Sequence, residues 1–370
     1  MNHCTPSSDL IVAIVGPTAT GKSSLAESLA QKLDGEIVSA DSMQVYQGMD
    51  IGTAKMPIGR RGVRYHCINL VSPDEEFNAF LYQRAARAAF EDIWSRGKQV
   101  ILCGGTGLYV RTALEAFVCH GDDPRGQVPR VIPNDPRDLS PRVVGTTAPG
   151  RPVPSEPALE AFVGTTAPGR PVPSESAIPR ASELRQRLTK EAEDLGPEAF
   201  HAKLAAIDPQ SAALIHPNNV RRVIRAFEWL EQGSSYMEQA AGFASNTEVY
   251  PVVYLGLTLP REKLYKLINE RVRQMIEQGL LQEVQGLLDK GYGQALTSQQ
   301  AIGYKELVGV LSGAVSLDIA VEQIQQATRR YAKRQLSWFK RNERIHWLDA
   351  QKPLDELTEE ADMIITKEMT

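Results

Sequence analysis

The chain has 370 residues, of which 42% are hydrophobic and 23% are charged, and its formal net charge is −4. These fractions are typical of a globular protein outside a membrane, and the length predicts more than one domain or a large insertion. No apolar run approaches membrane-spanning length, and the segment from Met1 to Asp9 lacks the apolar core of a signal peptide. We therefore expect a cytoplasmic protein, monomeric and without a membrane partner, in which any nucleic-acid binding depends on local basic surfaces.

The first predicted element is a buried strand from Leu10 to Val15, followed by a glycine-flanked loop and a helix that ends near Leu33. The loop reads GPTATGKS and has the GxxxxGK[ST] spacing of a phosphate loop. In such a loop, backbone amides surround an oxyanion, the lysine adds a mobile charge, and the last hydroxyl is placed to ligate Mg²⁺. The predicted phosphate-binding residues are Gly16, Pro17, Thr18, Ala19, Thr20, Gly21, Lys22 and Ser23, and Ser23 is also the predicted metal ligand.

A second predicted strand, Glu36 to Ala40, ends at Asp41. Open α/β sheets bind ligands at the carboxyl edge of their strands, so Asp41 is a candidate functional residue. A turn or helix-capping role is the alternative. Tyr65 to Leu70 is predicted to be a third strand, in which His66 packs rather than binds a ligand.

Phe77 to Arg96 has the pattern of a long helix, and Val100 to Cys103 that of another buried strand. This strand leads into GGTGLY, a second glycine-rich turn before a helix, which should bring Thr106 to the same edge as the phosphate loop. Taken alone, the turn is equally compatible with a tight strand-to-helix connection. The four cysteines, Cys4, Cys67, Cys103 and Cys119, form no CxxC pair, so we expect reduced, structural thiols.

From residue 119 to 180 the composition changes to Pro, Gly, Thr and Arg. The sequence VGTTAPGRPVPSE occurs identically at 144–156 and 163–175. Because these copies contain too few large apolar groups to offset the entropy lost on ordering, we predict a disordered, repeat-bearing insertion.

Helical patterns resume at Ala181, and residues 181–214 are predicted to form a helical arm. Pro251 to Leu259 resembles another core strand, and an amphipathic helix follows from Arg261 to Gln278. The predicted fold is therefore an α/β parallel sheet of the P-loop NTPase or kinase type, built from residues 1–118 and 215–350. Residues 351–370 are expected to form a C-terminal tail.

The last predicted helix of the core, Thr328 to Arg341, combines cations with aromatic residues. Arg330, Lys333, Arg334, Ser337 and Arg341 share one of its faces. This face suits a phosphodiester backbone, although a solvated charged face is the alternative.

Taken in order, these motifs resemble one family, the tRNA dimethylallyltransferases, also called tRNA isopentenyltransferases or the IPP transferase family. The matching segments are GPTATGKS, DSMQVYQGMDIGTAK, GGTGLY, HPNNVRRVIRA, GYKE and TRRYAKRQLSWFKR, which cover nearly the whole chain outside 119–180. The insertion departs from the family pattern, and the C-terminal zinc finger of some eukaryotic members is missing. A bacterial-type enzyme is implied.

The resemblance implies transfer of a dimethylallyl group from dimethylallyl diphosphate to the exocyclic amine of the adenosine 3′-adjacent to the tRNA anticodon. Diphosphate would be the leaving group, Mg²⁺ the cofactor and the anticodon stem-loop the partner. Asp41 matches the family's proposed general base and Thr106 its partner at the amine, while Arg271 falls on a diphosphate-binding position. Gln300 and the following residues match a tRNA-facing segment. The positions implied to face tRNA are Asp41, Ser42, Met43, Gln44, Thr106, Arg185, Arg221, Arg222, Val223, Ile224, Arg225, Lys305, Arg330 and Lys333.

Three other functions remain compatible with parts of this pattern. An adenylate isopentenyltransferase would use the same loop and aspartate on a free nucleotide, and a small-molecule kinase would bind ATP at the loop. An RNA-binding protein that has lost catalysis is the third.

Overall fold

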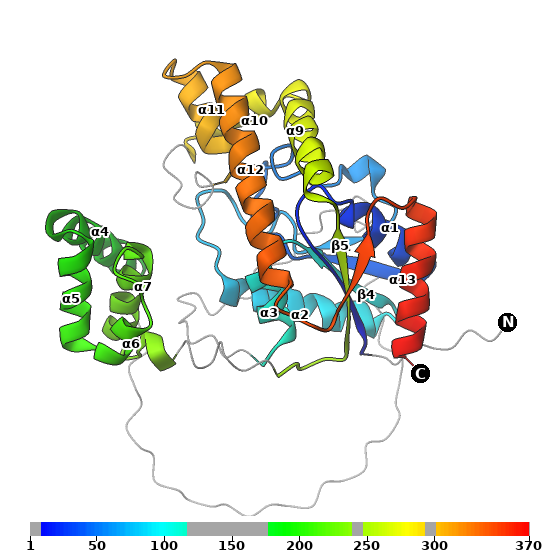
Figure 1. Cartoon of the computed structure of the whole chain (residues 1–370), viewed down its shortest axis with the longest axis horizontal. Coiled ribbons are helices and arrows are strands. Elements are labelled where there is room, and N and C mark those ends of the chain that lie inside the picture. Colours follow the sequence, from blue (N-terminus) through cyan, green and yellow to red (C-terminus); the bar gives the residue numbers. More distant parts are fainter. Residues whose placement is uncertain (1–8, 117–176, 239–246, 293–300, 370) are drawn as a thin grey trace, which may run out of the picture. The chain divides into compact units, whose positions relative to one another are not determined.

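Apolar strands near both ends of the sequence meet in one parallel sheet. The computed structural model describes residues 9–116, 177–238, 247–292 and 301–369. These residues form two compact units, one made of 9–116 with 247–369 and the other of 177–238 (Figure 1). The predicted disordered insertion lies outside the described residues as far as residue 176, as do Cys4, Cys119 and Gln300.

The sheet of the larger unit has the strand order β3-β2-β4-β1-β5-β6, and its neighbouring strands pair in parallel. Its strands are β1 (Ile11–Val15), β2 (Gly35–Ser39), β3 (Tyr65–His66), β4 (Gln99–Gly104), β5 (Val252–Thr258) and β6 (Ile345–Asp349). The residues of β1, β2 and β4 are buried throughout, as strands covered on both faces require.

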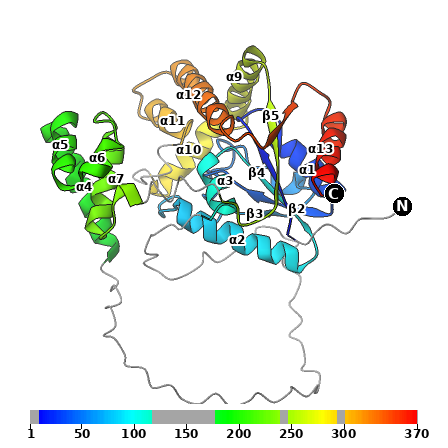
Figure 2. The same cartoon turned by 60° about the horizontal axis from the view of Figure 1, so that its bottom comes forward.

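Helices cover both faces of this sheet. The first 116 residues contribute α1 (Lys22–Lys32), the short 3₁₀ helix η1 (Ile58–Arg60), α2 (Ala79–Ser95) and α3 (Gly107–Leu114). The later part of the unit contributes α9 (Arg261–Glu277), α10 (Leu280–Asp289), α11 (Tyr304–Leu311), α12 (Leu317–Phe339) and α13 (Leu354–Glu368). Helices α1 and α13 pack on one face and α2 and α3 on the other (Figure 2). Because β1 alternates between the two cores, Val12 faces α1 while Ala13 faces α2.

The C-terminal residues are not a tail, contrary to the sequence-based prediction. Helix α13 buries Leu357, Ala361 and Ile365 against the sheet and α1. The apolar spacing of four residues in this segment is that of a helix with one buried face, which the polar residues between them obscured.

The predicted third strand is shorter than expected. Pairing with β2 ends at His66, because Cys67 and Asn69 adopt left-handed backbone conformations with φ of 58° and 53°. His66 itself is buried in the sheet, where its Nε2 lies 2.7 Å from Oε2 of Glu36. It therefore packs inside the strand, as the sequence predicted.

The smaller unit is a helical bundle that includes α4 (Ala177–Leu195), α5 (Pro197–Ile207), α6 (Pro209–Ala213) and α7 (Val220–Glu231). Its core includes Leu188, Phe200, Leu204 and Phe227, and the rings of Phe200 and Phe227 lie 5.1 Å apart. Because α7 belongs to this core, the helical arm extends past residue 214, its predicted end. The arm also begins earlier than predicted, at Ala177.

A buried ion cluster stabilises the amino end of the sheet. Glu36 is 5% exposed and accepts hydrogen bonds from His66 and from both terminal nitrogens of Arg96. Although burial favours the neutral acid, the hydrogen bonds from His66 and Arg96 lower the pKa of Glu36 to about 2. The charged carboxylate is therefore the form that the fold stabilises.

Replacing Glu36 by Gln should lower the free energy of unfolding at pH 7 by roughly 3–5 kcal/mol, the usual cost of breaking a buried ion pair. Because the pKa of Glu36 is lower in the folded state than its ordinary value of 4.5, its contribution is complete above pH 4.5 and is lost as the pH falls towards 2. Urea unfolding at several pH values should show the difference between the two proteins narrowing over this range. The exposed Glu91→Gln serves as a control, and a difference that does not depend on pH would contradict the assignment.

Candidate active site

Three loops meet at the carboxyl edge of the sheet because β2, β4 and β1 are neighbours. Ser39 pairs with Cys103, and Val15 pairs with Gly104, so the three strands end at the same level. The residues that follow them are Asp41, Thr106 and the phosphate loop. The structure thus brings together the sequence-predicted residues from three separate motifs.

The phosphate loop is closed around one of its own carbonyl groups. The Thr20 hydroxyl donates to the oxygen of Pro17 at 2.9 Å, and Nζ of Lys22 donates to the same oxygen at 2.6 Å. Gly16 has a φ of 133°, and a Cβ there would lie 2.6 Å from the carbonyl oxygen of Leu257 in β5. Glycine is therefore required where the loop leaves β1. Ser23 follows on the exposed first turn of α1, and its hydroxyl has no hydrogen-bond partner among the described residues.

Two cations lie close to the aspartate of this site. Burial lowers the pKa of Lys22 to about 8, an effect that Cys103 and Asp41 oppose and that Arg271 reinforces. Burial also lowers the pKa of Arg271, against the attraction of Asp41. Within the described part of the chain, Arg271 makes no hydrogen bond or ion pair. This arrangement leaves the guanidinium of Arg271 available to an anionic ligand.

Asp41 and Thr106 both accept hydrogen bonds from the same short backbone segment, the amides of Met43 and Ser42. An oxygen of Asp41 accepts from the amide of Met43 at 2.9 Å, and Oγ1 of Thr106 accepts from the amide of Ser42 at 3.1 Å. The Thr106 hydroxyl also lies 3.3 Å from Oγ of Ser42. Thr106 is the N-cap residue of α3, yet its side chain does not cap that helix. It is turned to the loop that carries Asp41.

The amide of Gln44 is fixed from both ends. Its oxygen accepts from the hydroxyl of Ser39 at 2.8 Å, and its nitrogen donates to the carbonyl of Thr53 at 3.1 Å. The loop around Thr53 is held in turn by Glu283 of α10, which accepts from the amides of three consecutive residues, Asp50, Ile51 and Gly52. Gln44 is therefore rigidly placed beside the end of β2.

Helix α12 adds two residues that were not among the predicted site residues. It runs beside α9 and reaches α3 (Figure 1). Gln335 accepts from the amide of Thr18 at 2.9 Å and donates to the carbonyl of Gly105 at 2.8 Å. Burial raises the pKa of Tyr331 to about 12, with a further contribution from Asp41. A glutamine inside a run of cations gives no signal of such a role.

The other side of α12 is cationic and exposed. Arg330, Lys333, Arg334 and Ser337 are exposed, as the helical spacing predicted. Lys305 in α11 is exposed as well, and its ammonium lies 3.6 Å from Oε1 of Glu306.

In the helical unit, two of the predicted tRNA-binding arginines form ion pairs with Glu228. Arg185 forms two hydrogen bonds to Glu228, and Arg225 forms a third at 3.0 Å. Although burial favours the neutral acid, these hydrogen bonds lower the pKa of Glu228. Arg221 and Arg222 are exposed and make no such bond among the described residues.

Two residues of α7 that the resemblance implies to face tRNA lie inside the bundle instead. Val223 and Ile224 are 0% and 8% exposed, so their side chains pack in the core of the unit. The matching motif ends at Ala226, partway along α7, and the exposed residues in its α7 part are Arg221, Arg222 and Arg225.

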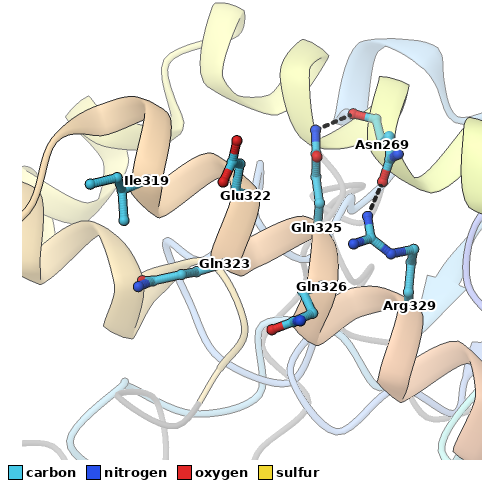
Figure 3. A pocket seen from close by; sticks show the side chains of 7 residues that line it. All are labelled: Asn269, Ile319, Glu322, Gln323, Gln325, Gln326 and Arg329. Carbon is cyan, nitrogen blue, oxygen red and sulfur yellow. Dashed lines mark hydrogen bonds between the residues drawn. The ribbon is translucent and has the colours of Figure 1, made fainter.

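A polar pocket of about 550 Å³ lies between α9 and α12 (Figure 3). Asn269 forms its wall: its side-chain oxygen accepts from Arg329 at 2.5 Å and its carbonyl accepts from Gln325 at 3.2 Å. None of the predicted site residues lines this pocket.

The described residues show neither a metal-binding cluster nor a reactive cysteine. They contain no group of three or more His, Cys, Asp or Glu side chains arranged to hold a metal ion. Burial raises the pKa of Cys67 to about 12 and of Cys103 to about 11, so both are thiols and not reactive thiolates. Across the same residues, no helix combines the length and apolarity needed to cross a membrane.

Two protein-family models match this chain. The IPP transferase model matches residues 44–135 and 165–342, and the isopentenyl transferase model matches 10–58. The tRNA dimethylallyltransferase of Caldanaerobacter subterraneus is 39% identical over 94% of this chain and 95% of its own length. That of Geobacillus thermodenitrificans is 41% identical over 93% and 91%.

Solved structures resemble the whole chain. A tRNA delta(2)-isopentenylpyrophosphate transferase from Staphylococcus epidermidis has a TM-score of 0.60 and 35% identity, covering 97% of this chain and 99% of that one. A eukaryotic dimethylallyltransferase described as acting on tRNA has a TM-score of 0.67 and 26% identity, covering 97% of this chain and 79% of its own.

Proposed function

This chain belongs to the IPP transferase family, and we infer that it is a tRNA dimethylallyltransferase, an enzyme that transfers a dimethylallyl group to tRNA. The observation that carries this inference is the meeting of the phosphate loop, Asp41 and Thr106 at one sheet edge, in a chain whose relatives match it over more than nine tenths of its length. A bacterial tRNA-modifying enzyme works in the cytoplasm, where we place this protein, as a monomer.

We propose dimethylallyl diphosphate as the donor and the exocyclic amine of the adenosine 3′-adjacent to the anticodon as the acceptor. In the transfer, the bond between the allylic carbon and the diphosphate oxygen breaks, and a bond from the amine nitrogen to that carbon forms. Diphosphate leaves with the electron pair of the broken bond. Asp41 takes the proton that the amine loses, and Thr106 holds the amine.

Charge on the departing diphosphate is the main electrostatic demand of this reaction. Lys22, Arg271 and the amides of the phosphate loop supply the positive charge and donors. The guanidinium of Arg271, which has no partner among the described residues, supports this role. The exposed hydroxyl of Ser23, which has no hydrogen-bond partner among the described residues, fits a Mg²⁺ ion, which takes oxygen ligands and keeps several waters. When bound, Mg²⁺ would add further neutralising charge at the diphosphate.

We propose that tRNA contacts the exposed cations of α12 and α7, together with Lys305. Ser42, Met43 and Gln44 would read the adenine, and the fixed amide of Gln44 is suited to hydrogen-bond with a base edge. Extruding the base costs a few kcal/mol, and least in a single-stranded loop such as the anticodon loop. Arg185 and Arg225 would contribute through their exposed sides while paired with Glu228.

Parallel incubations of the purified chain test the function. Dimethylallyl diphosphate with a radiolabelled prenyl group is offered to unmodified tRNA and, separately, to AMP, and labelled ATP is offered with the same acceptors. We expect label from the prenyl donor in tRNA alone. Label in AMP would instead support a free-nucleotide enzyme, and transfer of phosphate from ATP would support a kinase.

Removing two cations from α12 should weaken tRNA binding through lost phosphate contacts. For Arg330→Ala combined with Lys333→Ala, the slope of log K against log salt should shrink by about 1–2, because each phosphate contact contributes about 0.7–0.9. Binding of dimethylallyl diphosphate should be unaffected. Lys98→Ala with Lys352→Ala removes the same charge from residues that pair with surface acids and is the control. An unchanged slope in the α12 variant would assign those residues to a merely solvated face.

A further inference from the structure

Gln335 joins two of the three loops that form the active site. Its side chain extends from α12 and is only 5% exposed. Oε1 accepts from the backbone amide of Thr18 in the phosphate loop at 2.9 Å, and Nε2 donates to the carbonyl of Gly105 at 2.8 Å. One amide thereby connects the loop after β1 with the turn after β4.

The fit around this amide leaves no room for a larger neighbour. A Cβ at Gly105 would overlap with Nε2 of Gln335, so a side chain there would displace the amide from its present position. Its oxygen and its nitrogen each make a hydrogen bond, and exchanging the two would break both, so the buried amide has one favoured orientation. Gln335 is therefore a rigid spacer and not a mobile surface group.

The two hydrogen bonds of Gln335, called the bridge below, reach the two loops that carry the residues proposed to bind diphosphate and the amine. On one side Thr18 belongs to the phosphate loop, and its amide is committed to Gln335, not to a ligand. On the other side Gly105 directly precedes Thr106, whose hydroxyl holds the amide of Ser42 beside Asp41. Tyr331 lies one turn earlier on α12, where Thr106 and Gln335 act on its pKa against the effect of burial.

We propose that Gln335 is a positioning residue that fixes the distance between the diphosphate and the acceptor amine, and so determines whether the allyl group is transferred to tRNA or lost to water. The proposal rests on the function inferred above. In the transfer, the allylic carbon bonds to the amine nitrogen as diphosphate leaves. In the competing reaction a water oxygen bonds to that carbon, the water loses a proton, and dimethylallyl alcohol and diphosphate result.

The same helix carries the exposed cations proposed to contact tRNA. Arg330, Lys333 and Arg334 are exposed, whereas Gln335 points into the site. Shifting α12 would therefore move the phosphate loop against the Thr106 turn. Small displacements matter here, since a misplacement of about 1 Å can reduce the rate of a reaction about 100-fold.

The test compares Gln335→Met with Gln325→Met. Methionine keeps the approximate length and volume of glutamine but makes neither hydrogen bond. Gln325 is a matched control because it lies on the same helix, is 9% exposed and donates to the carbonyl of Asn269, away from the phosphate loop. In single turnovers at saturating tRNA and dimethylallyl diphosphate, Gln335→Met should be slower by about 10–100-fold, while the control stays close to wild type.

The product ratio separates positioning from general loss of structure. Gln335→Met should release a larger share of dimethylallyl alcohol per modified tRNA, whereas a variant that is merely less stable lowers both products together. A product ratio and rate equal to those of the wild type, or an equal change in Gln325→Met, would overturn the proposal.

Hydrogen exchange of the peptide that contains Thr18 provides a readout that needs no activity. Exchange there should be faster in Gln335→Met than in the wild type or in Gln325→Met, and equal protection would refute the bridge. A wild-type protein that modifies no tRNA would contradict the proposed function and leave this measurement decisive for the bridge. If Gln335→Met does not fold, Gln335→Glu keeps the shape and the acceptor for Thr18 but repels the carbonyl of Gly105, and the same product ratio and exchange are measured.

Discussion

Replacing Asp41 by Asn is expected to lower the single-turnover rate of tRNA prenylation by about 10²–10⁴-fold, the usual contribution of a general base. Asparagine has nearly the same shape and its oxygen can still accept from the amide of Met43, so the loop should keep its conformation. The affinity for tRNA should change little. Single-turnover rates measured beside tRNA binding curves test both expectations.

Asp34→Asn is the matched control. Asp34 precedes the amino end of β2, whereas Asp41 follows its carboxyl end, so the control removes the same charge from the opposite edge of the sheet. Thr106→Val should also slow the reaction, and Thr106→Ser should restore it, because the hydroxyl makes the contact with Ser42. Normal turnover by Asp41→Asn would remove the general-base assignment.

Replacing Lys22 by Met should have the second largest effect, because this residue is proposed to neutralise the leaving group. Loss of one such donor lowers the rate by about 10²–10³-fold, and the affinity for dimethylallyl diphosphate should fall as well. Lys32→Met, at the other end of α1, removes a cation that pairs with Glu359 and Asp362 and serves as the control. Equal losses in both variants would contradict a specific role.

The pKa of Lys22 adds a pH dependence with a definite sign. At a pKa of about 8, the side chain of the free protein is a cation below pH 8 and becomes neutral above it. The affinity of the wild type for dimethylallyl diphosphate should therefore decrease as the pH rises through 8, and Lys22→Met should show a flatter profile. Calorimetric titrations between pH 6.5 and 9.5, about 1.5 units on either side of this value, measure the difference. Parallel profiles would show that another group controls the binding.

Strands and helices with strong local patterns could be predicted from the sequence. The apolar run after Leu10 gives β1, the run around Leu255 gives β5, and the loop between Gly16 and Ser23 connects strand to helix as its spacing predicts. These features are local, because neighbouring residues determine them. The order of the strands depends on pairing between distant segments and required the structure.

The candidate site likewise contains residues that local sequence patterns predict and residues that they do not. Asp41 and Thr106 follow strands that the sequence reveals, so their meeting at one edge could be expected. The bridge of Gln335 joins positions 317 and 230 residues away, and no pattern in either segment points to the other. Val223 and Ile224 were predicted to face tRNA but are buried. A motif that matches a family does not tell which of its side chains face inward.

The strand order also has a consequence for how the chain is made. β1 lies between β4 and β5, and about 150 residues separate the end of β4 from the start of β5. At about 5–20 residues per second, the ribosome needs roughly 8–30 s to synthesise that stretch. Throughout this interval one side of β1, whose sequence is IVAIV, has no strand to pair with. The nascent protein thus presents an apolar strand edge, a template for self-association, until its second half emerges.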